Sequence, residues 1–261
     1  MIAVTDGRKR FPSTVLAYTP YREIAYYIEP DSSLDSCFSR EAWSPSGAEW
    51  YPEILENGRL TAFIAGNPGA GKSYLAKQLI QLLPEDYDIL LFTALEEDDG
   101  NFKEFKDRLW KIRMEPEVLK TITLSAIRAR SKHPILLFDD IDKIRDKTVE
   151  KLTFAILEDA LANGRGHKKH NGEGDIHTIV TSHALNDYRK TKYTLENSDY
   201  VGVFPASTTK CQYDRMFQKL GLPQELCDFT YEMGKNGECR SVLIKKTAPM
   251  YLIASPFITL I

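Results

Sequence analysis

Residues 63–80 read FIAGNPGAGKSYLAKQLI, and this stretch decides the fold of the chain. Its segment from Gly66 to Ser73 matches the pattern G-x4-G-K-[ST] at every required position. An apolar run precedes the pattern and an amphipathic run follows it, so it lies between a predicted strand and a predicted helix. Glycines at these positions let backbone N–H groups surround a phosphate at the positive end of the helix. The stretch therefore predicts a phosphate-binding loop in an α/β protein.

Each residue of this loop has an expected role in binding a nucleoside triphosphate. Lys72 should bridge phosphate oxygens and act in catalysis, and the hydroxyl group of Ser73 should bind Mg²⁺. The predicted nucleotide-binding residues are Gly66, Asn67, Pro68, Gly69, Ala70, Gly71, Lys72, Ser73 and Tyr74. The loop alone leaves the class of protein open, because kinases, GTPases, helicases, clamp loaders and DNA pumps all contain one.

Length and composition narrow the possibilities. The chain has 261 residues, of which 43% are hydrophobic and 27% charged, enough for one large domain or a domain with an appendage. The formal net charge is −3, so contacts with DNA would have to come from a local basic patch or a ring of subunits. Neither a signal peptide nor a membrane-spanning run is visible, and the cysteines form no C-x2-C pair. We therefore expect an intracellular protein with reduced thiols and no membrane contact.

Two regions differ in their sequence pattern. Residues 1–56 are rich in Pro, Ser and Tyr and are expected to form an irregular arm or a small strand-bearing extension. Residues 57–261 form the predicted P-loop domain, in which apolar strands alternate with amphipathic helices. Such alternation predicts a mainly parallel sheet with helices on both faces. The predicted strands are 60–66, 87–95, 133–142, 176–185 and 200–207, the helices are 73–83, 102–113, 117–130 and 148–162, and two short helices and two strands follow.

Two adjacent carboxylates end the apolar strand at residues 135–140, which reads ILLFDD. Asp139 is expected at the strand tip, where it can hold the Mg²⁺ shell through water. Asp140 is then placed to orient and activate the attacking water molecule. After a phosphate-binding loop, this pair predicts hydrolysis of the nucleotide.

A further strand, residues 176–185, ends in a cluster of hydrogen-bonding side chains. In helicase-, AAA+- and translocase-type folds, an additional strand lies between the phosphate-loop strand and the strand with the acids, and it carries a polar sensor. Thr181 and Ser182 are the sensor candidates here, with His183 beside them. Because no N-K-x-D motif follows the next strand, a GTPase is disfavoured. The fold class expected is therefore an additional-strand, RecA- or FtsK-like P-loop NTPase.

Basic residues offer candidates for contacts with nucleic acid and with a neighbouring subunit. The loop at 165–170, RGHKKH, could contact DNA phosphates through Arg165, Lys168 and Lys169, although a solvated surface loop is an equal alternative. His167 and His170 lack the companion ligands of a metal site. Candidates for an arginine that reaches a neighbour's nucleotide are Arg128, Arg130, Arg189, Arg215 and Arg240.

Together these motifs resemble a known family. The run TIVTSHALNDYRKTKYTLENSDYVGVFPASTTK, with ILLFDDID and the phosphate loop, resembles the genome-packaging ATPases of nucleocytoplasmic large DNA viruses, virophages and Polintons. These ATPases form the poxvirus-type branch of the FtsK–HerA superfamily. The resemblance spans roughly residues 58–261, and its specific part runs from Thr181 to Pro205.

The resemblance implies a ring of five or six subunits that uses ATP and Mg²⁺ to pump double-stranded DNA into a preformed capsid. It also implies a capsid or portal protein as a partner, and a location in the virion or in the host cytoplasm or viral factory. Family members tend to carry an arginine just after the "FP" pair, where this chain has Ala206. Another residue would then have to supply the trans-acting arginine.

Other readings of the sequence remain open. The main alternative is an AAA+-type switch, such as a helicase loader or clamp-loader-like protein, which remodels a protein or protein–DNA complex. A small C-terminal helical lid would favour that alternative, whereas the predicted tail is rich in strands. A scaffold with little turnover is disfavoured by the intact pair of Asp139 and Asp140. A nucleotide kinase is disfavoured because no arginine-rich lid is apparent.

Overall fold

The structure is a computed structural model of the whole chain. It describes residues 2–6, 15–18, 24–28, 49–50, 59–94, 100–166, 174–183, 185, 191–247, 250–254 and 257–260. For the strands before residue 59 and for the last strand, it describes the backbone only. The chain divides into two compact units, residues 59–203 and residues 1–58 together with 204–261. Each unit is described by itself below.

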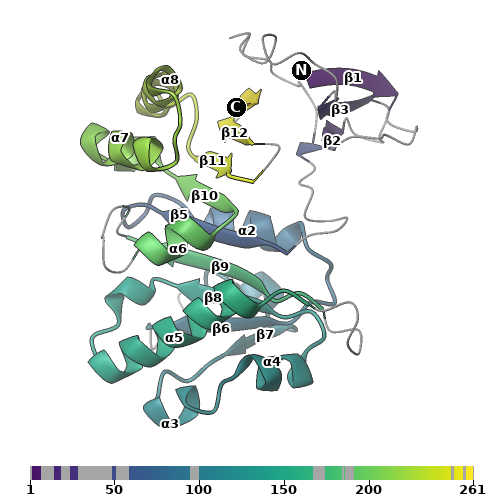
Figure 1. Cartoon of the computed structure of the whole chain (residues 1–261), viewed down its shortest axis with the longest axis vertical. Coiled ribbons are helices and arrows are strands. Elements are labelled where there is room, and N and C mark those ends of the chain that lie inside the picture. The colour runs from purple at the N-terminus through teal and green to yellow at the C-terminus, as the bar shows by residue number, and fades with distance from the viewer. Residues whose placement is uncertain are drawn as a thin grey trace. The chain divides into compact units, whose positions relative to one another are not determined.

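A parallel sheet forms the centre of the unit 59–203 (Figure 1). Its strands lie in the order β10-β5-β9-β8-β6-β7, and every pairing between these neighbours is parallel. All residues of β5, β6, β8, β9 and β10 are buried, as a sheet covered on both faces requires. The predicted mainly parallel P-loop fold is thus confirmed. The strands are β5 (Thr61–Ala65), β6 (Ile89–Thr93), β7 (Leu109–Lys111), β8 (Ile135–Asp139), β9 (His177–Ser182) and β10 (Tyr200–Val203).

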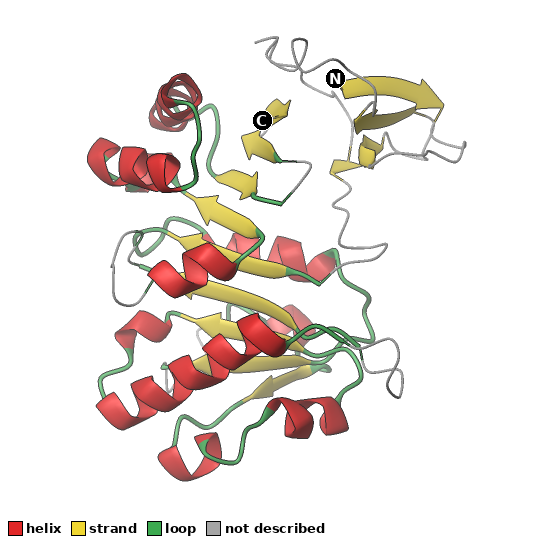
Figure 2. Ribbon diagram, in the orientation of Figure 1, coloured by secondary structure: helices red, strands yellow, loops and turns green. Residues whose placement is uncertain are grey.

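Helices cover both faces of this sheet (Figure 2). Helix α2 lies on one face, and α5 with α6 lies on the other (Figure 1). The carboxylate of Asp146 caps α5 by accepting hydrogen bonds from the N–H groups of Thr148 and Val149. The helices of this unit are α2 (Lys72–Gln81), α3 (Pro116–Leu119), α4 (Leu124–Arg130), α5 (Lys147–Asn163) and α6 (Lys192–Asn197), with 3-10 turns η3 (Lys103–Phe105) and η4 (Ile141–Lys143).

The predicted helix at 102–113 is wrong. Only the short turn η3 forms there, and the chain then extends into β7, which pairs in parallel with β6. The N–H group of Ile112 donates to the carbonyl of Leu91 at 2.8 Å, and the indole N–H of Trp110 donates to Asp88 at 3.3 Å. Pairing with β6 satisfies the backbone of this segment and overrides the helical pattern of its side chains.

The predicted helix at 117–130 is divided in two. Its second part begins after Thr123, whose side chain accepts a hydrogen bond from the N–H group of Ala126 at 3.2 Å. A threonine that caps the following helix competes with continuation of the preceding one, so α3 and α4 form instead of a single helix. Helix α6 was not predicted from the sequence.

The other unit contains a helical pair and antiparallel strands. Helices α7 (Lys210–Lys219) and α8 (Gln224–Lys235) follow the 3-10 turn η5 (Pro205–Ser207), and the hydroxyl groups of Tyr213 and Thr230 lie 3.0 Å apart between them. Strands β11 (Val242–Lys245), β12 (Tyr251–Ala254) and β13 (Phe257–Leu260) pair antiparallel, so the tail has one strand more than predicted. The N-terminal strands β1 (Ile2–Asp6), β2 (Val15–Tyr18), β3 (Ile24–Ile28) and β4 (Glu49–Trp50) also pair antiparallel.

The proposed boundary between an N-terminal extension and an ATPase domain, at residues 56 and 57, stays a prediction. In the division into compact units, residues 204–261 belong with residues 1–58 and not with residues 59–203. Within the described part of the chain, none of the helices combines the length and apolar character needed to cross a bilayer.

Candidate active site

The phosphate-binding loop follows directly from the end of β5. The N–H group of Gly66 donates to the carbonyl of Ser182 at 3.0 Å, which ties the start of the loop to β9. The loop then turns, with the N–H group of Ala70 donating to the carbonyl of Asn67 at 3.1 Å. Gly69 and Gly71 have φ angles of 77° and 115°, which residues with a side chain rarely adopt. These two glycines therefore allow the loop to close onto the first turn of α2.

The side chains of the loop differ in exposure. Asn67, Pro68 and Gly69 are exposed, so the tip of the loop is open to a ligand from solvent. Lys72 is buried, with 6% of its surface exposed, while Ser73 is half-buried. Tyr74 is 58% exposed on the first turn of α2. The loop thus presents backbone N–H groups and the Ser73 hydroxyl at the positive end of a ten-residue helix.

The strand β9 lies between the phosphate-loop strand β5 and the acid-bearing strand β8. Ile64 pairs with Thr181 and Ala65 with Ser182, while Phe138 pairs with Val180 on the other side. The carboxyl ends of the three strands therefore meet at one edge of the sheet. This arrangement confirms the additional-strand topology predicted from the sequence.

The hydroxyl group of Thr181 joins the two acids. It donates a hydrogen bond to Asp139 Oδ1 at 2.8 Å and accepts one from the backbone N–H of Asp140 at 2.9 Å. The single hydroxyl proton of Thr181 therefore forms the hydrogen bond to Asp139. The contact between this hydroxyl and Asp140 Oδ1 is longer, at 3.4 Å. In this arrangement Thr181 positions Asp139 and Asp140, and its predicted role as a sensor of the nucleotide stays a prediction.

Asp140 has an unusual backbone conformation. Its φ and ψ angles are 49° and 40°, and among the described residues it is the sole non-glycine residue with a positive φ. A left-handed conformation costs a non-glycine residue about 1–2 kcal/mol, although aspartate tolerates it better than most residues. Such strain persists where surrounding contacts impose it, and it is common at functional sites.

Cationic and imidazole groups surround the carboxylate of Asp140. Lys72 Nζ lies 3.4 Å from Oδ1, and Lys143 Nζ lies 3.4 Å from Oδ2. His183 Nε2 is also 3.4 Å from Oδ2. The phosphate-loop lysine and the predicted base are therefore already in contact, with 6% and 15% of their side chains exposed.

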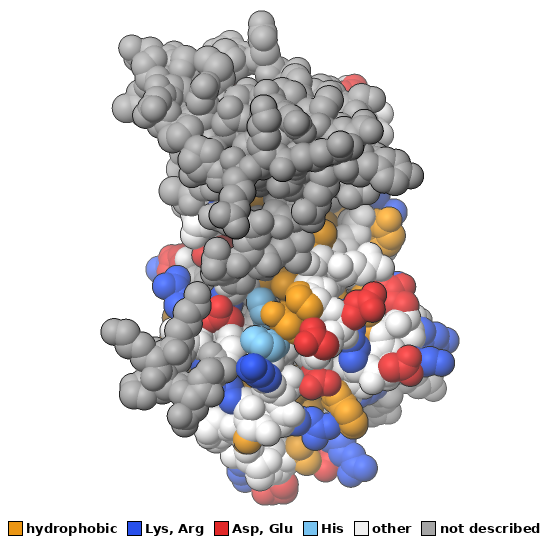
Figure 3. Space-filling view, turned by 90° about the vertical axis from the view of Figure 1, so that its right-hand side faces the viewer, with side chains coloured by type: hydrophobic (Ala, Val, Ile, Leu, Met, Phe, Trp, Pro, Cys, Tyr) orange, Lys and Arg blue, Asp and Glu red, His pale blue; other side chains and the backbone are white. Residues whose placement is uncertain are grey.

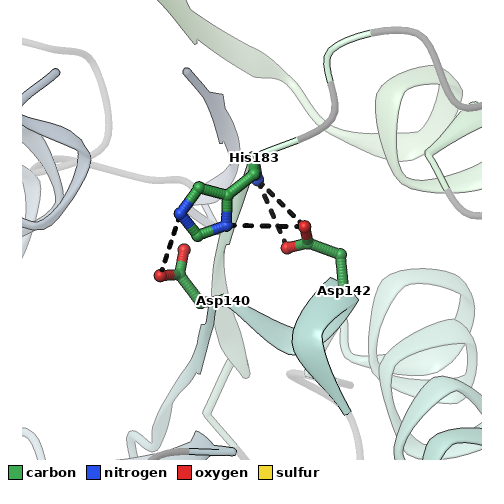
Figure 4. Close-up of side chains that lie close together, drawn as sticks. All are labelled: Asp140, Asp142 and His183. Atoms are coloured by element: carbon green, nitrogen blue, oxygen red, sulfur yellow. Dashed lines mark hydrogen bonds and ion pairs between the residues drawn. The ribbon is translucent and has the colours of Figure 1, made fainter. Parts of the chain in front are cut away.

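His183 lies between two carboxylates, those of Asp140 and Asp142 (Figure 4). Its backbone N–H donates to both oxygens of Asp142, at 3.2 and 3.3 Å, whereas its ring Nδ1 is 3.5 Å from Asp142 Oδ2, too long for a good hydrogen bond. Burial lowers the pKa of His183, and nearby Lys72 lowers it further, against the opposing effect of Asp140 and Asp142. This environment therefore favours the neutral imidazole more than solvent does.

Comparison with known proteins identifies the family. Residues 62–192 match the ATPase family associated with various cellular activities (AAA). This chain belongs to that family. The match spans the phosphate loop, both acids and the end of β9, so the protein is an ATPase, as predicted.

A viral relative is also found. The ATPase is 30% identical over 200 residues to "Uncharacterized protein V3" of Sputnik virophage, covering 74% of each chain. This match confirms the predicted relationship with virophage proteins, and it extends beyond the region matched by the AAA family.

Solved structures resemble the ATPase more distantly. The genome packaging NTPase B204 of Sulfolobus turreted icosahedral virus 2, in complex with AMPPCP, is 11% identical with a TM-score of 0.42, over 74% of this chain and 95% of that one. The cytoplasmic domain of the Thermomonospora curvata type VII secretion ATPase EccC is 14% identical with a TM-score of 0.48, over 83% and 28%. Likenesses this distant indicate neither function nor partners.

Two other predicted site residues of the ATPase are described. Ser182 is buried, and its carbonyl holds the start of the phosphate loop. The carbonyl of Arg165 accepts a hydrogen bond from the guanidinium group of Arg128 at 3.1 Å. Lys168 and Lys169 lie outside the described residues, so their predicted contact with DNA stays a prediction.

The arginine candidates have different surroundings. Arg128 also donates to the carbonyl of Asn163, and Arg130 lies over the ring of Trp110 at 4.2 Å. Arg215 and Arg240 are exposed, while Arg189 lies outside the described residues. The structure thus singles out none of them as the residue that reaches a neighbouring subunit.

Sequence reasoning missed Asp142. The segment Asp139-Asp140-Ile141-Asp142 contains a third carboxylate two residues beyond the predicted base. Asp140 directly precedes η4 and Asp142 lies within it, and the carboxylates of both approach the ring of His183. The D-x-D spacing was therefore the available signal for a third acid at this edge.

Proposed function

We propose that this ATPase is a motor that translocates double-stranded DNA into a preformed viral capsid. The observation that carries the proposal is the set of contacts at β9, whose end holds both acids through Thr181. The same segment, from Thr181 to Pro205, carries the sequence resemblance to packaging ATPases. The relative from Sputnik virophage supports a viral role.

Hydrolysis would use the groups already assembled at this edge of the sheet. The loop N–H groups and Lys72 bind the β- and γ-phosphates of ATP, and Asp140 accepts a proton from the attacking water molecule. Because Lys72 contacts Asp140 at 3.4 Å, a γ-phosphate that draws Lys72 away would release one oxygen of that carboxylate. Nucleotide binding would thereby prepare the base.

The residues also suit Mg²⁺. The hydroxyl oxygen of Ser73 and the carboxylate of Asp139 are the oxygen ligands that this ion prefers. Thr181 fixes one oxygen of Asp139 by a 2.8 Å hydrogen bond, which orients the carboxylate. When bound, Mg²⁺ would supply charge that stabilises the departing phosphate groups.

A pump of this kind would act as a ring of five or six subunits, with a capsid or portal protein as a partner. It would work in the virion or in the cytoplasm or viral factory of the host. On the face drawn in Figure 3, acidic and basic side chains are interspersed over the described surface. With a net charge of −3, the chain would therefore contact DNA through local basic groups gathered by assembly.

An AAA+-type switch that remodels a protein or protein–DNA complex is the second candidate. The match to the AAA family over residues 62–192 favours it, because that match covers the whole nucleotide site. The described tail weighs against it, since α7 and α8 are followed by the antiparallel strands β11 to β13 instead of ending as a helical lid.

Turnover of ATP with and without DNA distinguishes the two candidates. We expect the wild-type protein to hydrolyse ATP faster with linear double-stranded DNA, and the stimulation to grow with DNA length.

Two variants test the assigned roles of site residues. Asp140→Asn should retain binding of ATP and lose hydrolysis. Lys72→Ala should lose affinity for the nucleotide, because it removes the charge that binds the phosphates. Turnover in Asp140→Asn equal to wild type would refute the assigned base, and turnover indifferent to DNA would favour the switch.

A further inference from the structure

Asp142 connects the strand ends that carry the active site. It lies in η4, directly after β8, and its two carboxylate oxygens accept hydrogen bonds from the backbone N–H of His183 at the end of β9. Asp142 and His183 are separated by 41 residues in the chain. The contact therefore fixes the turn after the acids relative to the neighbouring strand.

We infer that Asp142 is a positioning residue for hydrolysis, which holds Asp140 in its left-handed conformation and holds the ring of His183 against the Asp140 carboxylate. This inference rests on the proposed role of Asp140 as the base. It adds a third acid to the two that the sequence motif predicts, with a role that differs from theirs.

Two hydrogen-bonded contacts to β9 enclose the strained residue. On one side, the N–H group of Asp140 itself donates to Thr181 Oγ1 at 2.9 Å. On the other side, Asp142 binds the N–H group of His183. A left-handed aspartate relaxes unless its neighbours prevent rotation of φ and ψ, and these contacts restrain the backbone on both sides of it.

The same contact directs the imidazole of His183. With its backbone N–H bound to Asp142 and its ring between the two carboxylates, His183 presents Nε2 to Asp140 Oδ2 at 3.4 Å (Figure 4). Lys143, from the same turn η4, lies at an equal distance from that oxygen. Oδ2 of Asp140 thus lies near both His183 and Lys143, while Oδ1 faces Lys72. Because the two oxygens have different neighbours, the carboxylate that would receive a proton from water is held in one orientation.

Steady-state kinetics of Asp142→Ala and Asp142→Asn test the role. The alanine variant should lower kcat at least tenfold and change the KM for ATP less than threefold, because the phosphate loop is untouched. Asparagine keeps an oxygen that can accept the His183 N–H bond, so it should restore kcat to within threefold of wild type. Asp159→Ala, a matched change at an exposed position of α5, should leave both constants unchanged.

Two kinetic outcomes would overturn the inference. One is an alanine variant whose kcat stays within twofold of wild type. The other is an asparagine variant as slow as alanine, since the hydrogen bond to His183 would then not be the cause of the loss.

Amide hydrogen exchange, followed by NMR, tests the contact without using turnover. The His183 amide should exchange at least tenfold faster in Asp142→Ala than in wild type or in Asp142→Asn. An unchanged exchange rate in the alanine variant would refute the contact with Asp142. A wild-type protein that hydrolyses no ATP would instead refute the proposed function, so the two failures are distinguishable.

Discussion

Thr181 and Thr178 lie on the same strand, β9, but their hydroxyl groups have different surroundings. The hydroxyl of Thr181 donates to Asp139 and accepts from the N–H group of Asp140. Thr178 is fully buried, and its hydroxyl has no hydrogen-bond partner among the described residues. A buried hydroxyl without a partner opposes folding, whereas one that hydrogen-bonds to two acidic residues contributes to stability.

We predict different effects from the same substitution at these two positions. Thr181→Val should lower the free energy of unfolding by about 1–3 kcal/mol, because it removes the buried hydrogen bond to Asp139 and the one from the N–H group of Asp140. It should also reduce ATP turnover at least tenfold. Thr178→Val should keep turnover and leave stability unchanged or raise it by up to about 1 kcal/mol. Urea unfolding and ATP turnover of the two variants check this, and equal behaviour of both would contradict it.

Helix α8 packs so closely on the turn η5 that it requires a glycine. A Cβ atom added at Gly234 would lie 2.4 Å from Cβ and 2.8 Å from Cγ of Pro205. The proline ring cannot rotate away, and both residues are buried. The close approach of these two elements therefore depends on a position without a side chain.

Gly234→Ala should destabilise the protein despite the higher helix propensity of alanine. In an exposed helix interior, the substitution would raise stability by about 1 kcal/mol. Here the overlap with Pro205 should instead lower the free energy of unfolding by about 1–3 kcal/mol. Glu232→Ala, at an exposed position of the same helix, should change it by less than about 0.5 kcal/mol. A gain of stability in Gly234→Ala, measured by urea unfolding, would refute the close packing.

The stability of the whole molecule should depend on pH through His177. Its Nδ1 accepts a hydrogen bond from the backbone N–H of Leu60 at 3.0 Å, which links β9 to the residue before β5. Burial is the main cause that lowers its pKa from 6.5 to about 4, against the opposing effect of Asp175. The unfolded chain therefore binds a proton at His177 more readily than the folded protein.

The contribution of His177 should be complete above pH 6.5 and should be lost as the pH falls towards 4. Over this window it amounts to at most about 3 kcal/mol of unfolding free energy, since each unit of pKa is worth about 1.4 kcal/mol. His177→Gln removes the titrating group, so the difference in stability between wild type and variant should shrink as the pH falls. Denaturant unfolding from pH 7.5 to 4 measures it, and a constant difference would contradict the prediction.

The sequence by itself determined the phosphate loop, the acid pair and the additional-strand topology. These features depend on local patterns: a glycine spacing between strand and helix, an apolar run that ends in carboxylates, and the order of the segments. The order of amino acids alone therefore made Lys72, Ser73, Asp139 and Asp140 candidate site residues. The local pattern predicted a helix at residues 102–113, but the chain there forms β7. The pairing of β7 with β6 outweighs the helical periodicity of the side chains.

Only the tertiary structure decided how the acids are held. The hydrogen bond from Thr181 to Asp139 joins residues 42 positions apart, and that from His183 to Asp142 joins residues 41 positions apart. No local pattern encodes such contacts, because they arise when β8 and β9 become neighbours in the sheet. The left-handed conformation of Asp140 has the same origin, since contacts with a neighbouring strand maintain a backbone that the residue alone would not prefer.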